Sequence, residues 1–242
     1  GKVINHGEEK YGSTVIADYL IDFIKTNQDK PFLAYYPMNL PHSPFDPTPR
    51  SVNRSNKDGK QNFIDMVAYM DHCVGRIEDT LIELGLRENT LMIFTADNGT
   101  SSSLTLDFFG TERKGGKGYT HDHGTKVPLI VNLPGRIKAG QVNKDLICFS
   151  DLFPTIVEAA NLPAKKITQA DGWSFWPQCL GKVGKKREWI YGYYFPRPFS
   201  KQFDMKYSHW EVAWARNKQY KLYRDGRFFD VIEDVREETP LG

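Results

Sequence analysis

The chain has 242 residues, of which 40% are hydrophobic and 26% are charged, and this balance excludes an intrinsically disordered protein. Its 32 basic and 30 acidic residues leave a net charge of +2, too weak to indicate nucleic acid or a membrane surface as the partner. Cys73, Cys148 and Cys179 lack metal-ligand spacing and are odd in number, which excludes a disulfide framework and a zinc site.

The first half of the chain alternates amphipathic segments with short apolar runs. Residues 13–25 place apolar side chains on one face and predict a helix. Residues 31–36 (PFLAYY) predict a buried strand, which a proline-rich loop follows. Residues 63–84 have apolar side chains every three or four positions and predict a second helix that Gly85 ends. Residues 90–95 (TLMIFT) predict another buried strand.

The second half predicts two kinds of structure. A third apolar strand is expected at 127–133 and a helix at 151–160, and the alternation of strands with helices indicates an α/β fold with a mostly parallel sheet flanked by helices. After residue 183 the apolar segments become short and aromatic, and turn residues separate them. We therefore expect residues 1–183 to belong to the α/β domain and residues 184–242 to form a small antiparallel α+β subdomain. Its strands are predicted at 189–195, 211–216, 220–223 and 228–232.

Asp97 and Asn98 directly follow the strand predicted at 90–95, at the edge where open α/β sheets bind their ligands. A carboxylate beside a carboxamide offers hard oxygen ligands, which suit calcium or magnesium better than zinc or copper. Taken alone, Asp-Asn-Gly is also a common turn at the end of a strand, and this interpretation is the simpler one for these residues by themselves.

Three further segments offer groups for an anion or a metal. Lys117 lies in the glycine-rich sequence KGGKG, which could bring backbone and ammonium groups to an anion or form an ordinary surface loop. His42 follows the first predicted strand and has prolines on both sides, although a single loop histidine is usually just solvated. His121 and His123 could be metal ligands, but their spacing provides no third ligand.

The order of these segments resembles a type I sulfatase, an arylsulfatase-like member of the alkaline phosphatase superfamily. The matching segments are FLAYYP at 32–37, PHSP at 41–44, TADNG at 95–99, GKGYT at 116–120, VPLI at 127–130, SDLFPT at 150–155, WAR at 214–216, YKLY at 220–223 and RFFD at 227–230. The resemblance spans nearly the whole chain. It implies an alkaline phosphatase-like fold and hydrolysis of a sulfate ester. Aromatic residues toward the C-terminus, such as Trp173 and Trp210, could stack on a sugar, which makes a sulfated carbohydrate one choice of substrate, although core packing is the simpler use of most of them.

The resemblance also implies roles for single residues. In this family a divalent metal, usually calcium, holds the sulfate ester against a formylglycine made from Cys or Ser, and magnesium is the alternative ion. Asp97 and Asn98 match metal ligands, while His42 and Lys117 match residues that contact the sulfate near its leaving oxygen. His121 and His123 stand where the family commonly has an acidic and small residues, so we expect them to contact the substrate.

The family's nucleophile lies in a Cys/Ser-x-Pro/Ala-x-Arg segment near the N-terminus, and none of the three cysteines here fits that pattern. We therefore expect this chain to be the C-terminal portion of a sulfatase whose formylglycine segment lies upstream, and to be poorly stable without it, because the missing strands would cover apolar surface. A periplasmic, secreted or lysosomal location is expected for the full-length parent.

Two other functions fit parts of the sequence. A phosphodiester or phosphonate hydrolase could use the same scaffold, but the Asp97-Asn98 pair disfavours it, because relatives with two transition metals typically have Asp-His there. A non-catalytic module that binds an anion or a metal is favoured by the missing nucleophile. Neither alternative involves nucleic acid or a membrane.

Overall fold

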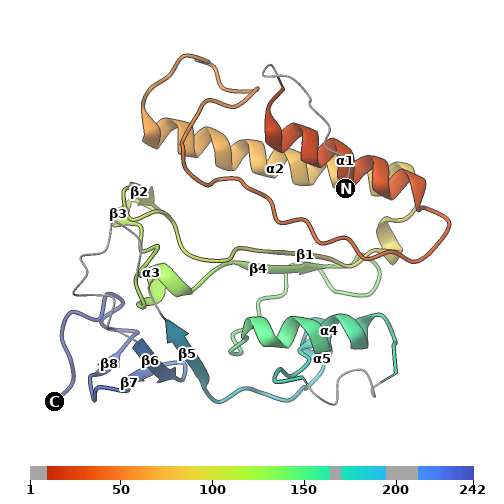
Figure 1. Ribbon diagram of the computed structural model, residues 1–242. Helices are drawn as coiled ribbons and strands as arrows, with labels where there is room; N and C mark the ends of the chain where they lie inside the picture. Colours follow the sequence, from red (N-terminus) through yellow and green to blue (C-terminus); the bar gives the residue numbers. More distant parts are fainter. Residues whose placement is uncertain (1–9, 164–169, 195–211) are drawn as a thin grey trace. The chain divides into compact units, whose positions relative to one another are not determined.

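The computed structural model describes residues 10–163, 170–194 and 212–242 (Figure 1). The chain divides into two compact units, one comprising Gly1–Thr90 with Thr105–Glu112 and the other Leu91–Leu104 with Arg113–Gly242. The first unit contains the two long helices, and the second contains the larger sheet. Across the described ranges, no helix combines the length and apolar character that a membrane crossing requires.

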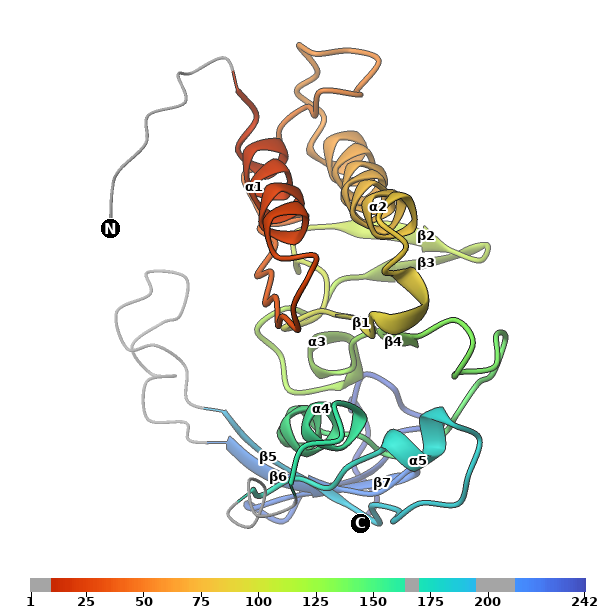
Figure 2. The same ribbon diagram turned by 90° about the vertical axis from the view of Figure 1, so that its right-hand side faces the viewer.

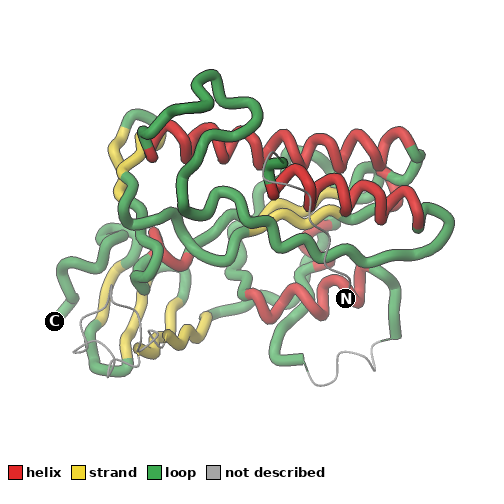
Figure 3. Tube along the Cα trace, turned by 45° about the horizontal axis from the view of Figure 1, so that its top comes forward, coloured by secondary structure: helices red, strands yellow, loops and turns green. Residues whose placement is uncertain are grey.

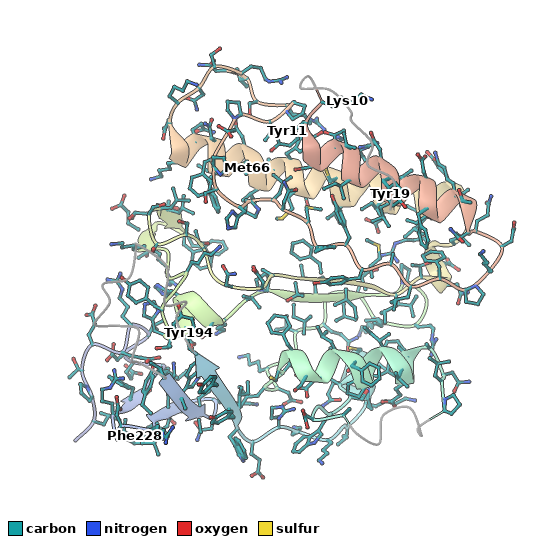
Figure 4. The ribbon with its side chains drawn as sticks, in the orientation of Figure 1. Lys10, Tyr11, Tyr19, Met66, Tyr194 and Phe228 are labelled. Carbon is teal, nitrogen blue, oxygen red and sulfur yellow. The ribbon has the colours of Figure 1, made fainter. Side chains whose placement is uncertain are left out.

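Helices α1 (Gly12–Thr26) and α2 (Gly59–Glu83) lie side by side in the first unit, and the one-turn η1 (Arg87–Asn89) follows them (Figures 1 and 2). Both predicted long helices are confirmed. α2 begins before its apolar periodicity does, because the Asp58 side chain caps it by accepting a hydrogen bond from the Lys60 N–H at 2.9 Å. Figure 4 shows Tyr11 and Met66, which belong to the core of this unit. The buried residues of that core are Ala17, Leu40, Met66, Tyr69 and Cys73.

The strand predicted at 31–36 is not formed. Figure 3 draws the whole connection between α1 and α2 as loop. Leu33 and Tyr35 are 75% and 87% exposed, although the segment is apolar enough for a buried strand. A strand exists only when a neighbour takes up its backbone hydrogen bonds, and none of the described residues pairs with this segment. The prediction was wrong because composition alone does not provide a partner.

The second unit contains strands β1 (Met92–Thr95) and β4 (Leu129–Asn132), which confirms two of the predicted strands. They pair antiparallel, so the mostly parallel sheet is not confirmed. A parallel pair needs a long crossover, usually a helix, whereas the only helix between these strands is α3 (Asp122–Thr125), a single turn. The same connection contains an unpredicted hairpin of β2 (Thr105–Phe108) and β3 (Thr111–Lys114), whose turn residues Phe109 and Gly110 both have positive φ.

The predicted helix at 151–160 is confirmed as α4 (Leu152–Ala159), which follows the one-turn η2 (Phe149–Asp151) and has Pro154 in its first turn. The short α5 (Trp176–Cys179) packs near α4. Asp151 joins these elements, because its buried carboxylate accepts hydrogen bonds from the Cys148 and Trp173 N–H groups, each at 2.8 Å.

The predicted C-terminal strands form one antiparallel sheet in the order β5-β6-β7-β8, part of which Figure 2 shows. Its strands are β5 (Ile190–Tyr194), β6 (Val212–Arg216), β7 (Tyr220–Tyr223) and β8 (Phe228–Asp230). The predicted end at Phe195 and start at Glu211 lie outside the described residues. Tyr223, Phe229 and Val231 form the core against one face of the sheet, while Leu222 and Tyr191 are exposed. The domain boundary after residue 183 stays a prediction.

Candidate active site

Asp97 and Asn98 follow the carboxyl end of β1, where the Thr95 hydroxyl donates a hydrogen bond to the Pro128 carbonyl at 2.8 Å. The Asp97 side chain is exposed, and neither it nor the Asn98 side chain has a hydrogen-bond or ion-pair partner among the described residues. A turn-forming Asp or Asn usually bonds to nearby backbone N–H groups. These two side chains instead leave their oxygens free, as metal ligands require.

The glycine-rich segment lies directly against the residues that follow Asn98. The Gly99 N–H donates to the Gly124 carbonyl, and the Lys117 N–H donates to the Thr100 carbonyl, both at 2.9 Å. A third bond of 2.9 Å joins the Gly115 N–H to the Leu104 carbonyl. The structure therefore brings the backbone of Lys117 beside the segment that carries Asp97 and Asn98.

The glycines of this region permit that close approach. A Cβ on Gly99 would lie 1.8 Å from the His123 carbonyl oxygen, and one on Gly115 would lie 2.1 Å from the Ser101 carbonyl oxygen. A Cβ on Gly124 would meet the Tyr119 carbonyl oxygen at 2.1 Å. Since no side chain fits at such distances, the glycine-rich sequence forms a packed backbone layer under Lys117 rather than a freely moving loop.

His121 and His123 lie in the same layer. Their ring centroids are 5.6 Å apart at 87°, and the His121 ring stacks on Tyr119 at 5.2 Å. The Nδ1–H of His123 donates to the Lys114 carbonyl at 3.2 Å, because a carbonyl can only accept. Burial, followed by the charge on His123, lowers the pKa of His121 and favours its neutral form.

The Nδ1 atom of His121 is buried and has no hydrogen-bond partner among the described residues. Buried polar atoms rarely stay unpaired in proteins, since leaving one unpaired costs about 1–3 kcal/mol. His121 therefore offers an unused donor or acceptor beside the glycine-rich layer. His121 and His123 by themselves do not form a histidine metal site, which would need a third ligand.

His42 lies in the first unit, on the loop between α1 and α2. Leu40 inserts into the core, and the Asn39 side chain accepts a hydrogen bond from the Ser13 hydroxyl of α1 at 3.0 Å, so the loop is fixed to α1 just before His42. The His42 Nδ1–H donates to the Ser43 carbonyl at 2.7 Å. This bond selects the tautomer and leaves Nε2 of an exposed imidazole available to a ligand.

The described residues fit a metal only in part. They contain no group of three or more His, Cys, Asp or Glu side chains that could hold an ion. Asp97 and Asn98 provide two hard oxygen ligands, and a calcium ion takes six to eight. A complete site would therefore need further ligands from outside the described residues.

Neither Cys73 nor Cys179 fits the role of a nucleophile. Cys73 is fully buried in the core of the first unit, where burial raises the pKa of its thiol. Burial raises the pKa of Cys179 to about 11, which leaves it protonated at neutral pH. We therefore derive no chemical step through a cysteine or a formylglycine of this chain.

The sequence profile of the Sulfatase family matches residues 3–162, two thirds of the chain. The chain belongs to the sulfatase family. A second profile, described as N-sulphoglucosamine sulphohydrolase, C-terminal, matches residues 113–240. This family generally uses a metal ion and a formylglycine.

Three relatives illustrate the similarity. An uncharacterized sulfatase of Escherichia coli K12, YdeN, is 33% identical over 182 residues, covering 72% of this chain and 32% of its own length. Human arylsulfatase A is 33% identical over 168 residues, covering 69% of this chain and 32% of its own. The crystal structure of Ps i-CgsB in complex with k-i-k-neocarrahexaose superimposes with a TM-score of 0.78 at 25% identity, covering all of this chain and 52% of that one. The solved relatives establish an alkaline phosphatase-like α/β fold.

The chain thus spans about a third of the length of the curated relatives that it matches. Within that part, sequence reasoning missed the polar side chains that support the glycine-rich layer. Asp122 is buried in an ion pair with Arg216 of β6, and Lys221 of β7 is buried against Thr120. The only signal was a lysine inside the apolar strand sequence YKLY, which by itself does not distinguish an inward from an outward side chain.

Proposed function

We propose that this chain is part of a sulfuric ester hydrolase and provides the portion of its active site that holds the metal and the sulfate. The observation that carries the proposal is the backbone layer that brings Lys117 beside the segment of Asp97 and Asn98. Membership of the sulfatase family supports the same conclusion.

The roles of the single residues come from the resemblance to sulfatases, and the chemistry of each residue is consistent with its role. Asp97 and Asn98 would hold a divalent cation, calcium or magnesium, through their free oxygens, and further ligands would come from elsewhere in the protein. When bound, that ion would neutralise charge on the sulfate ester. Lys117 would stabilise the charge that develops on the leaving oxygen. His42, in the first unit, would contact a sulfate ester through Nε2, since Nδ1 is already bonded.

The substrate is proposed to be a sulfated carbohydrate. The relative Ps i-CgsB has been solved with an oligosaccharide, k-i-k-neocarrahexaose. His121 and His123 would contact such a substrate, because they lie in the same backbone layer as Lys117. A sugar hydroxyl provides both the donor and the acceptor that a neutral imidazole can use.

Further strands are part of the proposal as well. β1 has one paired neighbour among the described residues. It could pair on its other side with a strand supplied by the rest of a longer enzyme, which would bring the sheet closer to the predicted mostly parallel one.

Hydrolysis of 4-nitrophenyl sulfate and of 4-nitrophenyl phosphate by the full-length gene product tests this function. We expect faster turnover of the sulfate, and chelation of divalent metal should abolish it. Faster turnover of the phosphate would instead identify a phosphate or phosphonate hydrolase. Calcium binding without turnover of either ester would identify a non-catalytic module.

A further inference from the structure

A polar cluster of Thr120, Lys221, Tyr223 and Glu237 joins the C-terminal sheet to the glycine-rich layer. Lys221 lies in β7, and none of its side chain is exposed. Its Nζ donates to the Thr120 carbonyl at 2.5 Å and to Oε1 of Glu237 at 2.8 Å. The other carboxylate oxygen of Glu237 accepts from the Tyr223 hydroxyl. That hydroxyl also shares a hydrogen bond of 2.8 Å with Oγ1 of Thr120.

Stability alone gives a weak reason for this cluster. Burial lowers the pKa of Lys221, with the hydrogen bond to Glu237 opposing the shift, which reflects the cost of taking an ammonium group out of water. A well-packed apolar residue of similar volume often stabilises a protein as well as a buried ion pair does. What an apolar side chain cannot do is hold the Thr120 carbonyl in one orientation.

The backbone of Glu237 gives a second, independent indication. Its φ is 59°, in the left-handed region that residues other than glycine seldom adopt. Such a conformation persists when surrounding contacts determine it, and here the Glu237 carboxylate satisfies both Lys221 and Tyr223. This backbone conformation thus accompanies the contact of the Glu237 carboxylate with Lys221 and Tyr223.

The segment that the cluster holds is part of the candidate site. Thr120 is fixed by Lys221 and Tyr223, and Asp122 is fixed by Arg216 of the neighbouring strand β6. His121 lies between these two anchored residues. Displacement of Thr120 would therefore move the His121 ring and the glycine-rich layer that carries Lys117.

We infer that Lys221, Tyr223 and Glu237 are positioning residues that fix the segment from Lys117 to His123 for binding a sulfated substrate. The inference rests on the proposed function, since the ligand is the substrate of that site. By this inference the C-terminal sheet contributes to substrate affinity as well as to packing, because its residues hold Thr120 in place.

Two substitutions that change the shape of a side chain very little test whether this polar cluster affects substrate binding. In the full-length gene product, Tyr223→Phe removes one hydroxyl, and Thr120→Val removes the partner of that hydroxyl. We expect each to raise KM for 4-nitrophenyl sulfate, and Ki for inorganic sulfate, at least about three- to tenfold. Thr120→Val loses the hydrogen bond to Tyr223, and Tyr223→Phe loses that bond together with the one to Glu237. The double variant should be no worse than Tyr223→Phe alone, because that substitution already removes the hydrogen bond that Thr120→Val removes.

Two matched variants serve as controls. Thr120→Ser keeps a hydroxyl at the same position, so its KM should equal that of the unsubstituted protein. Tyr220→Phe removes a hydroxyl from the same strand, where Tyr220 stacks on Phe228 at 5.3 Å, and should leave KM unchanged. A purely structural role would lower the melting temperature of Tyr223→Phe and leave KM and Ki at their normal values, and that result would overturn the inference.

Amide hydrogen exchange separates this inference from the proposed function. We expect faster exchange at 117–123 in Tyr223→Phe and Thr120→Val than in the unsubstituted protein, whether or not the ester is hydrolysed. If the unsubstituted protein does not turn over the sulfate ester, the proposed function fails while exchange still reports on the positioning. Unchanged exchange and unchanged KM in both variants would refute the positioning itself.

Discussion

Replacing Asp151 by alanine should destabilise the second unit strongly. The Asp151 carboxylate is 4% exposed and accepts two backbone hydrogen bonds of 2.8 Å, from Cys148 and Trp173. It also forms an ion pair with Arg187, whose guanidinium donates through both Nε and Nη2 and whose pKa this pair raises. Removing one partner of a buried pair leaves the other charge uncompensated, which typically costs about 3–5 kcal/mol.

The expected value lies near the lower end of that range. The Arg187 side chain is 15% exposed and can regain some water when its partner is removed. We therefore expect Asp151→Ala to lower the free energy of unfolding by about 3 kcal/mol. With a slope near 2 kcal/mol per molar urea, the unfolding midpoint should fall by about 1.5 M. Urea unfolding followed by tryptophan fluorescence measures this, and Trp173 lies at the substituted site.

An exposed pair in the same unit provides the matched control. Asp225 and Arg227 form an ion pair of 2.8 Å, with side chains 56% and 49% exposed. Asp225→Ala should cost less than about 1 kcal/mol, because water screens and replaces that interaction. If Asp151→Ala shifts the urea midpoint no further than Asp225→Ala does, the structural role assigned to the buried carboxylate is wrong.

Three more predictions follow from single positions. Gly75→Ala in α2 should raise the free energy of unfolding by about 0.5–1 kcal/mol, since the added Cβ meets nothing within 4 Å, and a lower melting temperature would contradict this. Gly99→Ala, whose Cβ would lie 1.8 Å from the His123 carbonyl oxygen, should lower kcat/KM at least about tenfold, while Gly75→Ala keeps normal kinetics. Burial, followed by the charge on Arg50, lowers the pKa of His72 in the folded protein. Because the unfolded chain then binds a proton more readily, the stability that neutral His72 allows is fully present above about pH 6.5, and it is lost as the pH falls through the pKa of His72 in the folded protein. The drop in melting temperature between pH 8 and pH 5 should therefore be smaller in His72→Gln, and an equal drop would count against this assignment.

Local patterns predicted the helices well and the first strand poorly. The apolar periodicity at 63–84 is complete within one segment, so it identified α2 without knowledge of any partner. The run at 31–36 has the composition of a buried strand, but strand formation depends on a neighbour that the described residues do not provide. Likewise, the alternation of strands and helices predicted parallel pairing, whereas β1 and β4 are joined through a one-turn helix and pair antiparallel.

The candidate site, too, could be predicted from local sequence only in part. Its ligand-type residues could be named from sequence, because Asp97 follows a strand and Lys117 lies among glycines. Their supporting contacts could not, since Lys221 reaches Thr120 across 101 positions of the chain. Hydropathy would place Leu222 inside and Lys221 outside, yet the structure has the reverse, because the buried ammonium is satisfied by distant groups.

Substitution of Lys117 tests the central claim most directly. Lys117→Met and Lys114→Met remove ammonium groups that lie three positions apart in the same glycine-rich sequence, and Lys114 is exposed at the end of β3. With 4-nitrophenyl sulfate and the full-length gene product, Lys117→Met should lower kcat/KM by about 100- to 1,000-fold, as expected for a group that stabilises transition-state charge, while Lys114→Met leaves it unchanged. Equal kcat/KM values for the two variants would contradict the assignment of the sulfate site to Lys117.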